Sequence, residues 1–240
     1  MNRFSGPKKF GFFLGKGRVG WGMRFAIQKG WKGREMLAVV SAAEGLGHSW
    51  SFRDTPLQGE IPMGSVEWCQ EAFGPHRIDF YPAFLRGRLF REVVLVKSSE
   101  VFRPRPTVPV FVKDATAWKT DFASALQPKG FLLPSGEWWV SEPIRFVNEW
   151  RYYVADGYVI TTGWYAGADE NKPAPSLDVV WPVGFSGAVD MGELEDGFMA
   201  LVECHAPFAC GWYGEDHRDY VHWQAMAWKE RGWWACGTGE

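Results

Sequence analysis

The sequence predicts an α+β fold in which helices pack on antiparallel hairpins. Three observations support this class. Two Asp-Gly pairs, Asp156-Gly157 and Asp196-Gly197, each join apolar runs, which is the strongest short-range hairpin signal that a sequence offers. Helical periodicity occurs near both ends of the chain. The 15 Trp, 18 Phe and 7 Tyr among 240 residues exclude a wholly disordered chain, because disordered chains are poor in aromatic residues.

Residues 1–60 predict a small N-terminal α/β subdomain. The pattern indicates a strand at 23–28, an amphipathic helix at 33–45 and a second strand at 49–52, followed by a turn-rich connection at 57–62. Such a strand-helix-strand unit is too small to stand alone. We therefore expect a lid or accessory subdomain attached to a main domain.

The main domain is expected to span residues 61–240. Ser65 is the predicted N-cap of a helix at 66–73. Strand patterns then dominate, at residues 90–97, 108–113, 137–141, 150–155 and 158–164. The second Asp-Gly pair joins strands at 188–195 and 198–203, and a helix capped by Asp216 runs over 217–231 until Gly232 ends it.

The formal net charge of −2 hides a basic N-terminal arm. Nine Lys or Arg stand against the single acid Glu35 within residues 1–35, and aromatic residues are interleaved with them. Such an arm can follow a polyanion and stack bases, so nucleic acid is one candidate partner. The alternative is a solvated strand and loop.

The four cysteines show no CxxC spacing, which leaves structural zinc and a disulfide framework without support. The first residues lack the apolar core of a signal peptide, and no run of 18 apolar residues predicts a membrane span. We therefore expect a reduced, cytoplasmic protein with no membrane partner.

The second hairpin predicts a pair of carboxylates. With a two-residue turn at Asp196-Gly197, counting outward along both strands places Asp190 opposite Glu203, and His205 points to the same face. Two carboxylates and a third polar group on adjacent strands suit a Mg²⁺ ion that also binds nucleotide phosphates. The alternative is a solvent-facing edge on which both acids are hydrated.

Basic residues on the predicted strands are candidates for phosphate contacts. Lys113 ends an apolar strand, and Lys119 follows six residues later. Arg151 shares one face of the first hairpin with Glu149, and an arginine on an interior strand face needs an anionic partner. The sequence offers either the neighbourhood of Glu149 or a ligand phosphate.

Six segments together resemble a divergent clade of ATP-grasp enzymes, the clade named for its signature arginine and lysines. The segments are Gly64-Ser65-Val66-Glu67-Trp68, Tyr81-Pro82, Phe111-Val112-Lys113, Trp139-Val140-Ser141-Glu142-Pro143, Glu149-Trp150-Arg151-Tyr152-Tyr153-Val154 and Asp196-Gly197 through Leu201-Val202-Glu203. The resemblance covers roughly residues 61–231. The clade includes bacterial and phage proteins and, more remotely, a eukaryotic factor that assists assembly of a translation initiation complex.

The resemblance implies an ATP-grasp fold, in which two α+β lobes with antiparallel sheets hold ATP between them. The first lobe would span about residues 84–142 and the second about 143–235. The resemblance also assigns roles to single residues. Lys113 and Lys119 would contact phosphates, Glu142 would lie where the hinge meets adenine, Arg151 would face the γ-phosphate or an acyl-phosphate, and Asp190 and Glu203 would bind the metal.

Two positions depart from the family pattern. His205 stands where the family usually has an asparagine, and Trp164 stands where members often have an arginine. The leading hypothesis is an ATP- and Mg²⁺-dependent ligase that joins a carboxylate to an amine or similar nucleophile, with a peptide, a protein or a nucleic-acid base among the candidate substrates. The alternative, motivated by these two departures, is an ATP-binding assembly factor for a protein partner that does not turn ATP over.

Overall fold

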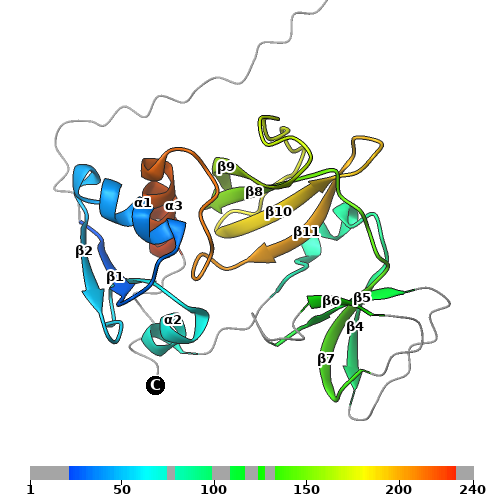
Figure 1. Cartoon of the computed structure of the whole chain (residues 1–240), viewed down its shortest axis with the longest axis horizontal. Coiled ribbons are helices and arrows are strands. Elements are labelled where there is room, and N and C mark those ends of the chain that lie inside the picture. The colour runs from blue at the N-terminus through cyan, green and yellow to red at the C-terminus, as the bar shows by residue number, and fades with distance from the viewer. Residues whose placement is uncertain (1–21, 75–78, 99–108, 117–123, 128–132, 231–240) are drawn as a thin grey trace, which may run out of the picture.

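The computed structural model describes residues 22–74, 79–98, 109–116, 124–127 and 133–230. Most of the predicted basic arm (residues 1–21), Lys119 and the predicted helix end at Arg231-Gly232 lie outside the described residues. Within the described residues the chain forms three sheets, one of three strands and two of four strands (Figure 1). None of the described helices is long and apolar enough to span a membrane.

The N-terminal sheet has the predicted strand-helix-strand unit at its centre. β1 (Arg24–Gln28) and β2 (Ser49–Arg53) are parallel, and α1 (Arg34–Ala42) connects them. α1 buries Glu35, Ala38, Val39 and Ala42, which recur at helical spacing. The short 3-10 helix η1 (Glu44–Leu46) follows α1.

A third strand, β3 (Ile61–Met63), pairs with the other side of β1. The prediction of a turn-rich connection over residues 57–62 is therefore wrong for Ile61 and Pro62. Proline usually argues against a strand, but β3 lies at the sheet edge, where a missing N–H donor is tolerated.

Two further helices pack with this sheet. α2 (Val66–Phe73) begins as predicted, because the Ser65 side chain accepts a hydrogen bond of 3.2 Å from the backbone N–H of Trp68. α3 (His217–Glu230) lies beside α1 and also contacts the strands of the first predicted hairpin (Figure 1). The N-terminal sheet therefore shares its hydrophobic core with helices that follow residue 60.

The second sheet is antiparallel and follows the 3-10 helix η2 (Ala83–Arg88). Its order is β4-β7-β5-β6, with bounds Val93–Ser98 for β4, Gly136–Ser141 for β7, Val110–Asp114 for β5 and Ser124–Gln127 for β6. β4 begins later than the predicted residue 90, since Phe90 has a φ of +49° and lies outside the extended region. β6 has no counterpart among the predicted elements.

The third sheet contains both Asp-Gly hairpins and has the order β11-β10-β8-β9. Its strands are β8 (Asn148–Ala155), β9 (Tyr158–Gly167), β10 (Gly187–Glu193) and β11 (Met199–His205). Asp156 and Gly157 both have positive φ, 48° and 76°, and join β8 to β9 in the predicted two-residue turn. The antiparallel hairpin prediction is confirmed here.

The two faces of this third sheet have different surroundings. Trp150, Tyr152 and Val154 of β8 point into a core that η2 closes, whereas Tyr153 points into the core shared with α3. Trp223 of α3 covers Tyr153, with ring centroids 4.8 Å apart. α3 therefore covers only one end of this face, and the other end faces the β4–β7 sheet, where the candidate site lies (Figure 1).

Candidate functional site

A pocket of about 350 Å³ lies between the two four-stranded sheets. The segment that leaves β7 lines one wall, and strands β8 to β11 line the opposite wall. The lining residues are Tyr81, Arg91, Phe111, Ser141, Glu142, Pro143, Ile144, Phe146, Glu149, Tyr165, Asp190, Val202 and Glu203. A volume of this size is at the lower end of the range for small-molecule sites.

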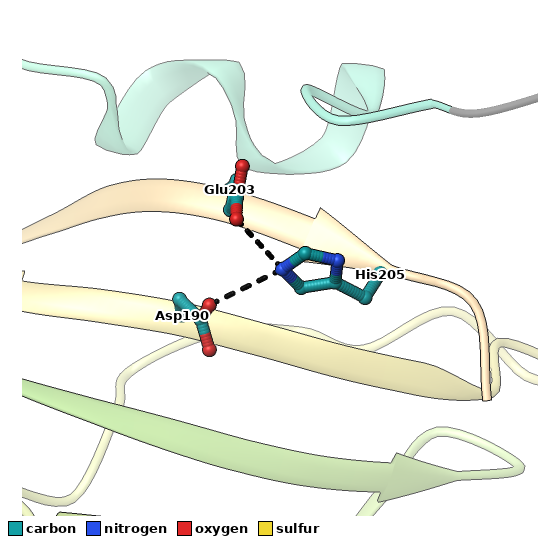
Figure 2. A group of neighbouring side chains, drawn as sticks. All are labelled: Asp190, Glu203 and His205. Carbon is teal, nitrogen blue, oxygen red and sulfur yellow. Dashed lines mark ion pairs between the residues drawn. The ribbon is translucent and has the colours of Figure 1, made fainter. Parts of the chain in front are cut away.

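Asp190 and Glu203 lie directly opposite each other on β10 and β11, as predicted. The ligand atoms of Asp190, Glu203 and His205 all lie within 4.8 Å of one another. Figure 2 shows the His205 imidazole between the two carboxylates. Its Nε2 is 2.7 Å from Glu203 Oε1 and 3.3 Å from Asp190 Oδ2.

The connection that produces this pairing differs from the predicted two-residue turn. The Leu194 N–H donates to the Phe198 carbonyl at 2.9 Å, and Gly197 has a φ of +84°, so the loop contains three residues. Met191 then pairs with Leu201. A bulge farther along β11 shifts the register by one residue and restores the pairing of the two acids.

The two carboxylates are neutralised by three cationic side chains. Burial opposes charge on each carboxyl, but the charge of Arg151 lowers the pKa of Asp190, and the charges of His205 and Lys113 lower the pKa of Glu203. Burial also opposes charge on His205, yet the charge of Glu203 and hydrogen bonds to both acids raise the pKa of His205. The imidazole is therefore held in its protonated form between two ionised acids.

Arg151 is buried and pairs with Asp190. Its Nε and one terminal nitrogen each donate to Asp190 at 2.7 Å, which is the bidentate geometry of a strong pair. The guanidinium also lies between the rings of Tyr165 and Tyr213, at 5.3 and 5.1 Å from their centroids. The interpretation that Glu149 is the anionic partner of Arg151 is wrong, because Asp190 has this role.

Lys113 extends from β5 toward the other lobe, where its Nζ pairs with Glu203 Oε2. The ammonium also lies 3.9 Å from the centroid of the Phe80 ring. Glu142 directly follows β7, and its exposed side chain lines the pocket rim. The structure therefore brings Lys113, Arg151, Asp190, Glu203 and His205 together and places Glu142 at the edge of the same pocket.

Trp164 does not line the pocket. It pairs with Trp150 and packs in the core closed by η2. The next pair along the ladder is Glu149 with Ala166, so Tyr165 is an extra residue that the bulge turns into the pocket. The pocket residue at this point of β9 is therefore Tyr165, whereas the sequence pattern directed attention to Trp164.

Glu149 and Arg91 also line the pocket without having been assigned a role from the sequence. Burial, together with the charges of Asp190 and Glu203, raises the pKa of Glu149 to about 7. Its position two residues before Arg151 on the same strand face could have indicated a site residue. Nothing near Arg91 in the sequence indicates its contacts, because these are made with residues about 110 positions away.

The donor set fits a divalent metal ion in part. Two carboxylates on adjacent strands provide the hard oxygen ligands that Mg²⁺ prefers, and the protonated imidazole lies between them. A cation is therefore already stabilised at this point of the site. A metal ion held by both acids requires His205 to move or to lose its proton.

Two lobes with antiparallel sheets around a pocket, one lobe carrying a lysine and the other paired acids, form the arrangement of an ATP-grasp protein. The sequence model for the ATP-grasp domain of family 2, in the clade named for its signature arginine and lysines, matches residues 87–223, more than half of the chain. The chain belongs to this family. The predicted fold class is confirmed, and family membership supports an ATP-dependent, ligase-type function.

Several solved structures are similar to the chain. A RimK domain ATP-grasp protein from Sphaerobacter thermophilus has 11% identity over 85% of this chain and 99% of its own, with a TM-score of 0.48. D-alanine–D-alanine ligase from Bacillus anthracis, complexed with ATP, has 11% identity over 87% and 98%, with a TM-score of 0.45. The macrocyclase MdnC from Microcystis aeruginosa, bound with a precursor peptide, has 11% identity over 88% and 100%, with a TM-score of 0.42.

No curated protein matches the sequence. Identities this low concern the fold alone, so the family assignment rests on the match over residues 87–223.

Proposed function

We propose that the protein is an ATP- and Mg²⁺-dependent ligase that joins a carboxylate to an amine or a similar nucleophile through an acyl-phosphate. The observation that supports this most directly is the pairing of Asp190 with Glu203 at the interlobe pocket, within reach of Lys113 from the other sheet. ATP would bind between a first lobe of about residues 84–142 and a second lobe of about 143–235.

Residues of the first lobe would hold the nucleotide. Lys113 would transfer its ammonium from Glu203 to a phosphate oxygen once the metal neutralises that carboxylate. Lys119 would provide a second phosphate contact. Glu142, at the pocket rim directly after β7, would lie beside the adenine.

Asp190 and Glu203 would hold the metal ion after His205 leaves the space between them, and His205 would then be free to bind a phosphate or remain as a third ligand. The metal would neutralise negative charge on the β- and γ-phosphates. Arg151 would keep Asp190 ionised and correctly oriented. A direct contact of Arg151 with the γ-phosphate or an acyl-phosphate would require part of its pairing with Asp190 to be exchanged.

The proposed reaction has two steps. A substrate carboxylate oxygen attacks the γ-phosphorus, the bond to the β-phosphate oxygen breaks, and ADP leaves. An amine then attacks the acyl carbon, phosphate leaves, and the amine loses a proton. Both steps need water to be excluded, and the location of the carboxylates between two sheets supports this requirement.

The test is acceptor-dependent formation of ADP and phosphate by the purified chain with Mg²⁺, across a panel of carboxylates, amines, peptides and proteins. Glu203→Ala should abolish this turnover and leave the circular dichroism spectrum unchanged. Glu195→Ala is the matched control, because Glu195 lies near the turn of the same hairpin with a side chain 77% exposed. Full turnover by Glu203→Ala would refute the site assignment.

A second candidate is an ATP-binding assembly factor that closes its lobes around a protein partner without turning ATP over. The position of His205 favours it, since an imidazolium already neutralises the acids that would otherwise hold the metal. Tight ATP binding without ADP or AMP formation across the same panel would support this alternative over the ligase.

A further inference from the structure

Arg91 joins the two lobes at the pocket. It lies between η2 and β4, and one terminal nitrogen, Nη1, donates to the carbonyl of Leu89 at 3.1 Å and to that of Leu201 at 2.8 Å. The other, Nη2, donates to the carbonyl of Val202 at 3.4 Å. The guanidinium is therefore anchored in its own lobe and bonded to β11 of the other lobe.

The two β11 carbonyls belong to the bulge. Met191 pairs with Leu201, and Asp190 pairs with Glu203, so Val202 is the extra residue. In a regular strand successive carbonyls point to opposite sides, and one guanidinium would reach only alternate ones. Contact with two consecutive carbonyls thus fits the local disruption of the strand.

The bulge decides which face Glu203 occupies. Leu201 and Cys204 point into the core closed by η2, whereas Val202 and Glu203 both line the pocket. Without the extra residue, the register set by the three-residue loop would pair Asp190 with Val202. A slip of one residue turns every side chain beyond it to the other face, so Glu203 would then point away from the pocket.

We propose that Arg91 is a positioning residue that holds this bulge and thereby keeps Glu203 opposite Asp190. The part of this proposal that concerns metal and nucleotide rests on the proposed function. The part that concerns the bulge does not. Arg91 suits the task because its planar, permanently charged fork donates to several carbonyls at once, which a lysine ammonium on a flexible stem does less well.

The first experiment measures the bulge without any nucleotide. Amide hydrogen exchange over residues 199–205 is compared, by NMR, among the wild type, Arg91→Met, Arg91→Lys and Arg88→Met. Arg88 is the matched control, because its exposed guanidinium also donates to a backbone carbonyl, that of Asp178, outside the pocket lining. We expect exchange about tenfold faster in Arg91→Met, an intermediate value in Arg91→Lys and no change in Arg88→Met. Unchanged exchange in Arg91→Met would overturn the proposal.

The second experiment measures ATP affinity by calorimetry, once with Mg²⁺ and once with a chelator. We expect Arg91→Met to lose about tenfold of the Mg²⁺-dependent gain in affinity and to keep its affinity in the chelator, with partial recovery in Arg91→Lys. An equal loss in both conditions, with normal exchange in β11, would identify a direct nucleotide contact and overturn the positioning role. If the wild type bound no ATP, the proposed function would fail, and the exchange data would still decide whether Arg91 holds the bulge. If Arg91→Met did not fold, Arg91→Lys would supply both readouts.

Discussion

Replacing Arg151 with methionine should destabilise the protein by about 3–5 kcal/mol, because it leaves the carboxylate of Asp190 buried without its main partner. Arg151 and Asp190 are only 5% and 1% exposed, and two hydrogen bonds of 2.7 Å join them. The remaining cation near Asp190 is His205, at 3.3 Å and shared with Glu203. Solvent has little access to either charge, so screening should not reduce this cost to that of a surface pair.

The measurement is urea unfolding at pH 7.5 of Arg151→Met, Asp190→Asn and the double variant. The double variant should lose less than the sum of the two single losses, since it buries no stranded charge. Arg151 lowers the pKa of Asp190 below its ordinary 3.8, so the pair stabilises the fold above about pH 4, and this stabilisation is lost as pH falls further. The penalty in Arg151→Met should therefore shrink on acidification. A loss of less than about 1 kcal/mol at pH 7.5 would show that the pair behaves as an exposed one and would refute this reasoning.

Two further predictions concern single positions in the third sheet. The pKa of Glu149 is about 7 in the folded protein against an ordinary 4.5, so its contribution to stability is complete below about pH 4.5 and is lost as pH rises through 7. Glu149→Gln should therefore have a higher Tm than the wild type at pH 8 and the same Tm below pH 5; identical curves across this range would contradict the assigned shift. Gly163 pairs with Arg151, and a Cβ there would lie 2.3 Å from the carbonyl carbon of Tyr213 and 2.5 Å from the N of Gly214. Gly163→Ala should cost about 1–3 kcal/mol in urea unfolding, and a neutral result would show that this loop yields easily.

The sequence predicts local elements well where their chemistry is local. The Ser65 cap and the Asp156-Gly157 turn depend on residues within a few positions of each other, and both are found as predicted. β3 was missed because Pro62 argues against a strand, and only the sheet order shows that this strand lies at an edge. The partner of an edge strand is decided by tertiary packing, which single-sequence patterns do not contain.

The candidate site was predicted correctly at its centre for a reason that is partly wrong. A two-residue turn and a regular ladder place Asp190 opposite Glu203, and so do a three-residue loop and a bulge at Val202. The two differences cancel because each shifts the register by one residue. A bulge leaves little trace in a sequence, since the residue that holds it, Arg91, lies about 110 positions away.

The partner of Arg151 illustrates a second limit. Strand alternation places Arg151 and Glu149 on one face, but it does not say which strand lies alongside β8. The sheet order puts β10 between β8 and β11, so Asp190 is directly across from Arg151. The network of paired charges therefore depends on a contact between strands from different hairpins.

The central claim is that the Asp190–Glu203 pair binds a metal ion together with ATP in the interlobe pocket. Calorimetric titration with a non-hydrolysable ATP analogue, with and without Mg²⁺, tests it most directly in the wild type, Glu203→Gln and the control Glu195→Gln. We expect the wild type and Glu195→Gln to bind at least about tenfold more tightly with Mg²⁺, and Glu203→Gln to lose that gain. Equal affinity with and without Mg²⁺ in the wild type, or an undiminished Mg²⁺ effect in Glu203→Gln, would contradict the claim.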